Sequence, residues 1–230
     1  MACNAFDLVI FDCDGVLIDS EMISAGLLAR EMANLVPSID LDYVLTHYLG
    51  RAFPRVAVKF ETAFGQALDD DFERRYRDKL AVEFEGKLTE MPGVRHVLAN
   101  LAVPHCVATS SSPARVKMSL EMIDLLDECE DVLYTSSQVR RGKPAPDLFL
   151  HVAKEMQVEP SACLVIEDSM PGIRAALAAG MTVWHFTGGS HLQRSCAQLT
   201  KGVVPHHTFS TFDDFFKLEP GLKQIKRNRG

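Results

Sequence analysis

The sequence predicts an α/β protein in which a doubly wound parallel sheet carries an inserted, all-helical domain. Two observations support this fold class. Short apolar runs rich in strand-forming residues alternate with helical patterns along most of the chain, which is typical of a parallel sheet covered by helices. That alternation is interrupted once, between residues 18 and 85, where only helical patterns occur.

Each apolar run has the length of a strand and is apolar on both faces, as expected for a strand buried in a parallel sheet. Ser112 and Pro113 form an N-cap followed by a proline at the first helical position, which predicts a helix after the second run. Pro146 and Pro171 open two further predicted helices. The five predicted strands are residues 6–11, 106–109, 131–135, 163–166 and 182–186. Strands and helices in this order predict a Rossmann-like sheet.

The segment that interrupts the alternation predicts about four consecutive helices. One of them carries an apolar stripe that ends at Gly65, a residue type that commonly terminates helices. We therefore expect a helical cap domain at residues 18–85 and an α/β core formed by residues 1–17 and 86–230. Because ligands of open α/β sheets bind beyond the carboxyl ends of the strands, we expect the cap to cover that edge.

The composition narrows the function classes. The 230 residues carry a formal net charge of −7, which argues against nucleic acid as a partner. We expect no membrane association, because no apolar stretch reaches the roughly 18–20 residues of a membrane span and the N-terminus does not resemble a signal peptide. The six cysteines are scattered without a CxxC pair, which favours reduced thiols and a cytoplasmic location. We expect a monomer, because the sequence shows no exposed apolar stripe.

Two acidic residues follow the first predicted strand. Asp12 and Asp14 flank Cys13 and precede Gly15, which permits a sharp turn. Two carboxylates this close repel each other unless a cation lies between them, and Mg²⁺ is a hard cation that prefers such oxygen ligands. The same charge disfavours a Cys13 thiolate, so we expect that thiol to be inert. An ordinary acidic turn would also explain these residues, so this motif alone does not decide the function.

Hydroxyl and cationic side chains follow the next two predicted strands. The run Thr109–Ser112 precedes a helix, where hydroxyls and free backbone N–H groups form an anion site; Ser112 is also expected to cap the helix. Lys143 lies in the proline-stiffened loop GKPAP and offers a point charge that suits a phosphate group. A solvated surface lysine is the alternative interpretation.

Glu167 and Asp168 follow the fourth predicted strand. Consecutive carboxylates at the end of a buried strand are costly unless they are compensated, and metal ligation is the simplest compensation. Asp168 would also suit the N-terminus of the helix that Pro171 opens. Because the carboxyl ends of parallel strands converge, the four motifs predict one site with a metal, two functional carboxylates and two anion binders. That set is typical of phosphoryl transfer through an aspartyl-phosphate.

The pieces FDCDGVLIDSE, VATSSS, GKPAPD and VIEDSMPGIRAALAAGM resemble, in order and spacing, the motifs of haloacid dehalogenase-like hydrolases with a small helical cap. The resemblance covers nearly the whole chain. It implies that Asp12 is the nucleophile and a Mg²⁺ ligand. It also implies that Asp14 is the general acid and then the base, with its backbone carbonyl on the metal.

The resemblance assigns roles to the other motifs as well. Thr109 and Lys143 would hold the phosphoryl group, helped by the backbone N–H of Ser110. Asp168 would complete the metal site, with Glu167 beside it or behind it. Asp14 argues against a true dehalogenase, since those relatives lack the second aspartate.

The expected activity is Mg²⁺-dependent hydrolysis of a small phosphorylated metabolite, a sugar phosphate such as 6-phosphogluconate by resemblance. A β-phosphoglucomutase-type mutase is the alternative. Such mutases carry Gly-x-Ser-Arg in the cap, whereas this chain has the run Gly50–Phe53 with the sequence GRAF, which favours hydrolysis. A binding protein without turnover is a second alternative, which the intact motifs disfavour. We leave His47 and His191 outside the site, because lone histidines are more often structural.

Overall fold

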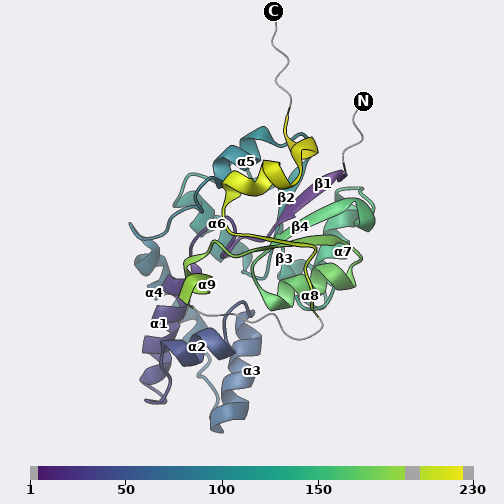
Figure 1. Cartoon of the computed structure of the whole chain (residues 1–230). Coiled ribbons are helices and arrows are strands. Elements are labelled where there is room, and N and C mark those ends of the chain that lie inside the picture. The colour runs from purple at the N-terminus through teal and green to yellow at the C-terminus, as the bar shows by residue number, and fades with distance from the viewer. Residues whose placement is uncertain (1–4, 195–202, 225–230) are drawn as a thin grey trace, which may run out of the picture.

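The computed structural model describes residues 5–194 and 203–224, and its centre is a six-stranded parallel sheet (Figure 1). The strand order is β3-β2-β1-β4-β5-β6, so the chain winds outward from β1 in both directions. The strands are β1 (Leu8–Phe11), β2 (His105–Thr109), β3 (Leu133–Thr135), β4 (Cys163–Glu167), β5 (Thr182–Phe186) and β6 (His207–Phe209). The predicted fold class, a doubly wound α/β sheet, is confirmed.

The central strand β1 separates two apolar cores. Val9 and Phe11 belong to one buried cluster, and Leu8 and Ile10 belong to the other. Successive side chains of a strand point to opposite faces, so a fully apolar strand requires cover on both sides. Helices α5 and α10 contribute to the first cluster, and α7 and α8 to the second. Their bounds are α5 (Val94–Asn100), α7 (Asp147–Glu155), α8 (Met170–Ala178) and α10 (Phe215–Leu218).

Helix α6 (Pro113–Glu121) begins at the predicted proline, and α7 and α8 begin within one residue of theirs. Helix α6 starts after Ser112, whose side chain accepts a hydrogen bond from the Arg115 backbone N–H. Helix α8 starts after Ser169, which accepts from the Gly172 N–H. Each cap satisfies a backbone donor that the first helical turn leaves free, and each helix has a proline in its first two positions. A short helix, α9 (Ser190–Arg194), follows β5.

The interrupted segment folds into four α-helices, which lie below the sheet in Figure 1. They are α1 (Glu21–Ala33), α2 (Leu41–His47), α3 (Phe53–Phe64) and α4 (Phe72–Phe84). Helix α3 ends at Gly65, which has a φ of 69° and so takes the left-handed conformation that glycine adopts freely. The predicted all-helical cap is confirmed, while its bounds at residues 18 and 85 stay a prediction.

Two adjacent chain segments form a neck between cap and core. The Asp19 backbone N–H donates to the Thr89 carbonyl (2.9 Å), and the Met91 N–H donates to the Leu17 carbonyl (2.8 Å). The chain therefore enters and leaves the cap at neighbouring points.

Three strands of the sheet differ from the prediction by more than one residue, and the first is β1, which begins at Leu8 rather than at residue 6. Strand β3 begins only at Leu133, because Glu130–Val132 form a single 3₁₀ turn ahead of it. The edge strand β6 was not predicted, since its three residues include two exposed ones and form no apolar run. Short edge strands of this kind leave little periodic signal.

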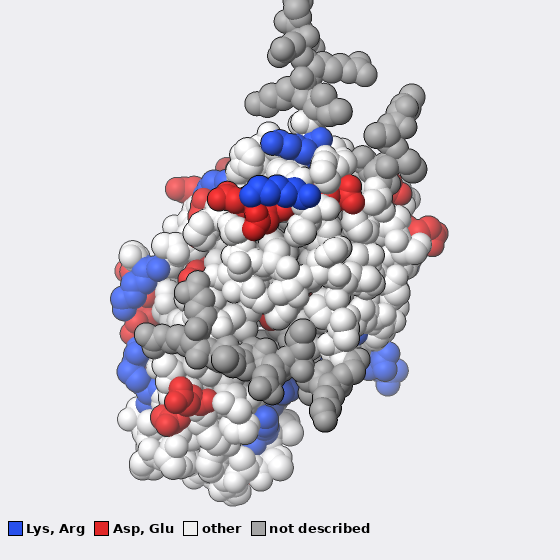
Figure 2. All heavy atoms as spheres, in the orientation of Figure 1, with Lys and Arg blue, Asp and Glu red and all other residues white. Residues whose placement is uncertain are grey.

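The cysteine prediction holds for the residues that the structure describes. Cys13, Cys106, Cys129 and Cys163 are buried and free, whereas Cys3 and Cys196 lie outside the described residues. Within the described part of the chain, no helix has the length and apolar character needed to cross a membrane. On the face shown in Figure 2, basic and acidic side chains are interspersed.

Candidate active site

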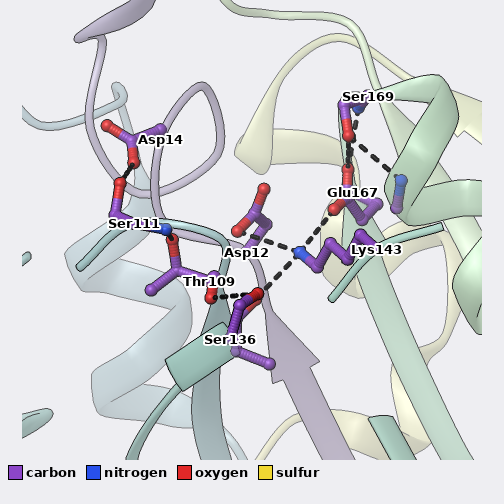
Figure 3. A network of polar contacts seen from close by, with 10 residues as sticks. Asp12, Asp14, Thr109, Ser111, Ser136, Lys143, Glu167 and Ser169 are labelled. Carbon is purple, nitrogen blue, oxygen red and sulfur yellow. Dashed lines mark hydrogen bonds and ion pairs between the residues drawn. The ribbon is translucent and has the colours of Figure 1, made fainter. Parts of the chain in front are cut away.

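The predicted site residues converge at the carboxyl edge of the sheet (Figure 3). Asp12 follows β1, Thr109 ends β2, and Asp168 follows β4, while Lys143 reaches in from the loop after β3. All four side chains are buried, which shields their interactions from water and strengthens them. The convergence inferred from the strand ends is therefore present in the structure.

Lys143 links two carboxylates at the centre of the site. Its Nζ lies 3.1 Å from Asp12 Oδ1 and 2.6 Å from Glu167 Oε1, and it also donates to the Ala108 carbonyl (2.9 Å). Burial by itself would lower the pKa of Lys143, but Asp12 and Glu167 outweigh burial and raise that pKa. The ammonium group therefore stays charged and provides a fixed positive charge beside Asp12.

Glu167 is engaged on both carboxylate oxygens. Oε1 accepts from Lys143, and Oε2 accepts from the Ser169 backbone N–H (2.8 Å) and hydroxyl (2.9 Å). Burial raises the pKa of Glu167, but Lys143 and Ser169 more than offset it, and the net pKa is lowered. Gly172 makes room for this arrangement, since a Cβ there would lie 1.7 Å from Oε1. Glu167 thus orients Lys143 in this structure.

Asp12 and Asp168 form the part of the site that suits a cation. Oxygens of Asp12, Glu167 and Asp168 lie within 4.8 Å of one another. Burial and the neighbouring carboxylates raise the pKa of both Asp12 and Asp168 well above the ordinary value, although Lys143 lowers it in part. Carboxylates that repel each other in a buried pocket are the donor set that a hard divalent cation prefers, so these residues fit Mg²⁺.

Asp14 is held apart from this cluster. Its carboxylate accepts from Ser20 Oγ (2.5 Å) and Ser111 Oγ (2.5 Å) and pairs with Arg115 Nη2 (2.9 Å), and Figure 3 shows it turned toward Ser111. Burial raises the pKa of Asp14, but Arg115 and the two hydroxyl donors outweigh burial and lower it. Gly15 allows the chain to turn here with a φ of 81°. The carboxylate is therefore anionic and tethered in this structure.

The hydroxyl run forms the side of the site nearest the α6 N-terminus. Thr109 Oγ1 accepts from the Ser111 backbone N–H at 3.0 Å, which shapes the turn between β2 and α6. Ser110 is half-buried and lines the cavity above the carboxylates. Hydroxyls and backbone N–H groups near a helix N-terminus suit an anion, as the sequence indicated.

The cap closes one cavity over these residues. Cap side chains that line it include Glu21, Tyr48, Arg51 and Tyr76. Burial, followed by the charge of Asp14, raises the pKa of Glu21 to about 7. A ligand in this cavity would contact Asp12, Asp14 and Asp168 on one side and cap side chains on the other.

Sequence reasoning missed several residues of this site. Arg115 is the clearest, since it pairs with Asp14, bonds Ser24 of α1 and lies over the Phe84 ring of α4. Its signal was its position three residues after the helix cap Ser112, because the first turn of α6 lies at the site. His191, left outside the prediction, lies with Nε2 3.0 Å from Asp168 Oδ2.

Two smaller expectations concern residues near the site. His47 does not line the cavity; its backbone carbonyl accepts from Lys59 Nζ in the cap. Burial, then Asp14 and Asp12, raise the pKa of the Cys13 thiol well above its ordinary value, which keeps the thiol protonated. Cys13 is therefore inert as an acid–base group, as expected.

Comparison with known proteins identifies the family. A model of the haloacid dehalogenase-like hydrolases matches residues 6–180, which include every predicted site residue. The chain belongs to the haloacid dehalogenase-like hydrolases. The family resemblance seen in the sequence is thereby confirmed, together with the prediction of an enzyme of the phosphatase kind, since curated relatives of this hydrolase carry phosphatase names.

The hydrolase is similar to two curated phosphatases and to a solved structure. It is 27% identical over 189 residues to 6-phosphogluconate phosphatase of Escherichia coli (strain K12), covering 82% of this chain and 86% of that protein. It is 30% identical over 184 residues to a phosphorylated carbohydrates phosphatase of Thermotoga maritima, covering 76% and 82%. Its fold matches the crystal structure of a conserved haloacid dehalogenase-like protein of unknown function from Agrobacterium tumefaciens, with a TM-score of 0.79, 32% identity and coverage of 93% and 97%.

Proposed function

We propose that this hydrolase is a Mg²⁺-dependent phosphatase that cleaves a small phosphorylated sugar or related metabolite through an aspartyl-phosphate on Asp12. The observation that carries the proposal is that the buried Asp12 carboxylate lies close to both the Lys143 ammonium and the Asp168 carboxylate. A nucleophilic carboxylate needs a neighbouring positive charge to meet an anionic phosphate. Lys143 supplies one such charge, and a bound Mg²⁺ would supply the other and polarise the phosphoryl oxygens.

The proposed first half-reaction forms the aspartyl-phosphate, an acyl phosphate on Asp12. An oxygen of Asp12 bonds to phosphorus while the bond from phosphorus to the substrate's ester oxygen breaks. Asp14 donates a proton to that leaving oxygen, and Thr109, Lys143 and the Ser110 backbone N–H hold the phosphoryl oxygens. A phosphate dianion beside Asp14 would raise the pKa of that carboxyl, since like charges disfavour ionisation, and so opposes the effect of Arg115.

The proposed second half-reaction releases phosphate. Asp14 accepts a proton from water as the water oxygen bonds to phosphorus, and the bond between phosphorus and Asp12 breaks. We propose that Asp12, Asp168 and the Asp14 backbone carbonyl hold the cation, and that Glu167 acts beside them by fixing Lys143. The engagement of both Glu167 oxygens supports this division.

The substrate class rests on the relatives and on the cavity. Both curated relatives above are named for phosphorylated carbohydrates or sugar acids. The cavity side chains of this chain include Glu21, Tyr48 and Arg115, whose polar groups can bond hydroxyls. We therefore propose sugar and polyol phosphates, with 6-phosphogluconate as the first candidate.

A sugar phosphomutase is the second candidate, because Arg51 lines the same cavity and could meet a second phosphate group. In this structure its Nε donates to the His47 carbonyl, and the neighbouring serine typical of such mutases is absent from the GRAF run at Gly50–Phe53. These features favour hydrolysis. We further propose that residues 18–85 act as the substrate-selecting cap and that the enzyme works as a monomer in the cytoplasm.

The test is phosphate release from a panel of sugar, polyol and nucleotide phosphates with Mg²⁺ and with EDTA. Wild type should release phosphate only with Mg²⁺, and Asp12→Asn should lower kcat by at least about 10³-fold, because it removes the nucleophile. Asp7→Asn is the matched control, since Asp7 is exposed and lies just ahead of β1, at the opposite end from Asp12. Isomer interconversion stimulated by a bisphosphate, without net phosphate release, would establish the mutase instead.

A further inference from the structure

Two histidines contact Asp168, one at its backbone and one at its side chain. His185, in β5, has its Nε2 3.1 Å from the Asp168 backbone carbonyl oxygen. His191, in α9, has its Nε2 3.0 Å from Asp168 Oδ2. A carbonyl oxygen only accepts hydrogen bonds, so the His185 nitrogen must be the donor. The residue is therefore held at its backbone and at its side chain by two separate imidazoles.

The contact between His191 and Asp168 is tightly enclosed. Both side chains are buried, with exposed fractions of 1% for His191 and 5% for Asp168. A Cβ at Gly15 would lie 1.9 Å from Asp168 Oδ2, and a Cβ at Gly189 would lie 2.7 Å from His191 Cε1. The chain therefore has glycine at both points where a side chain would push this pair apart.

Helix α9, which carries His191, is anchored through its first residue to the segment that follows β1. The Ser190 hydroxyl donates to Asp19 Oδ1 (2.8 Å), and its backbone N–H donates to the same oxygen (3.2 Å). Asp19 lies in the neck between core and cap. The backbone bond does not depend on the side chain at position 190, so it would still hold the start of α9 to the neck if the hydroxyl were removed.

We propose that His191 is a positioning residue that orients the Asp168 carboxylate for the divalent cation of the proposed function. By binding Oδ2, it keeps the carboxylate in the orientation that places an oxygen within 4.8 Å of the Asp12 and Glu167 oxygens. Partners that orient a metal-ligating group typically change metal affinity by about 10–100-fold when they are removed. The inference rests on the proposed function only through the existence of that cation site.

The test measures binding of Mn²⁺, an oxygen-preferring stand-in for Mg²⁺, to substrate-free protein by electron paramagnetic resonance of the free ion. His191→Phe keeps a ring but removes the N–H, and should weaken Mn²⁺ binding about 10–100-fold. His191→Gln retains an N–H donor and should bind between that variant and wild type. Ser190→Ala, in the same loop but without a contact to Asp168, should bind like wild type. Melting temperatures without metal check that each variant is folded.

Kinetics supply a second measurement. With an activated aryl phosphate as substrate, His191→Phe should raise the half-saturating Mg²⁺ concentration by the same factor, while kcat at saturating Mg²⁺ changes little. Equal Mn²⁺ affinity of wild type, His191→Phe and His191→Gln would overturn the inference and leave the proposed function standing. An equal loss in Ser190→Ala would also overturn it, since the loop rather than the imidazole would then be responsible. Absence of Mn²⁺ binding by wild type would instead refute the cation site itself.

Discussion

Replacing Glu167 by glutamine tests whether the buried Lys143–Glu167 pair supports the site. The change keeps the side-chain shape but removes the negative charge 2.6 Å from the Lys143 ammonium. Removing one partner of a buried ion pair costs about 3–5 kcal/mol, because the other charge is left without compensation. Lys143 retains Asp12 at 3.1 Å, so we expect the low end, about 3 kcal/mol. For a chain of this size, that corresponds to a melting temperature lower by roughly 6–12 °C.

The sign of the pH dependence follows from the lowered pKa of Glu167. A carboxyl whose pKa is lowered in the folded state stabilises the fold above its ordinary pKa, near 4.3, and loses that contribution as the pH falls through the folded-state value. The difference between wild type and Glu167→Gln should therefore be constant around pH 7 and shrink only in acid, below roughly pH 4.

Thermal and urea unfolding of metal-free protein would measure this difference. Glu130→Gln is the matched control, since Glu130 forms a 2.8 Å pair with Lys117 in which both side chains are about half exposed. Exposed pairs contribute at most about 1 kcal/mol. A Glu167→Gln variant that unfolds within about 1 kcal/mol of wild type, no further than the surface control, would refute the reasoning.

Three further predictions concern Arg115, Gly172 and Ser112. Arg115→Met should raise the pKa of Asp14, because the guanidinium that lowers that pKa is gone. The high-pH limb of kcat/KM, where Asp14 loses its proton, should therefore move to higher pH for a sugar phosphate. It should stay in place for p-nitrophenyl phosphate, whose leaving group needs no proton. Gly172→Ala should destabilise the protein by about 1–3 kcal/mol in urea unfolding, despite the better helix propensity of alanine, because the new Cβ would lie 1.7 Å from Glu167 Oε1; unchanged stability would contradict the packing. Ser112→Ala should lower the melting temperature by roughly 2–4 °C through the lost α6 cap, a cost of about 1 kcal/mol, and an unchanged value would show that the cap contributes nothing.

The sequence was sufficient for the residues that follow strands. Asp12, Thr109 and Asp168 were predicted to meet because parallel strands end at one edge, and each strand was visible as an apolar run. The start of α6 was marked by Ser112 followed by proline, and Pro171 marked the start of α8 to within one residue. These features follow from local sequence patterns and from the rule that parallel strands end at one edge of the sheet, so they could be predicted without knowing any interatomic distance.

Other features could not be predicted, since they depend on which side chains meet. Arg115 and His191 reach the site from the first turns of α6 and α9, where the strand-end rule gives no guidance. The pairing of Lys143 with Glu167 rather than with a phosphate or solvent depends on a separation of 2.6 Å that no spacing in the sequence encodes. Pairings of this kind are set by tertiary packing, which the periodicity of a single chain does not record.

The neck between cap and core has consequences for the synthesis of this enzyme and for its redesign. Because Leu17 and Asp19 are hydrogen-bonded to Met91 and Thr89, the two ends of the helical insertion lie next to each other. During translation β1 is synthesised first, and the whole helical insertion follows before the neighbouring strand β2. β1 therefore cannot pair with β2 until the insertion has been synthesised. The same closeness leads us to expect that another helical segment joined at the same two points would leave the strand ends that carry Asp12 and Thr109 in place.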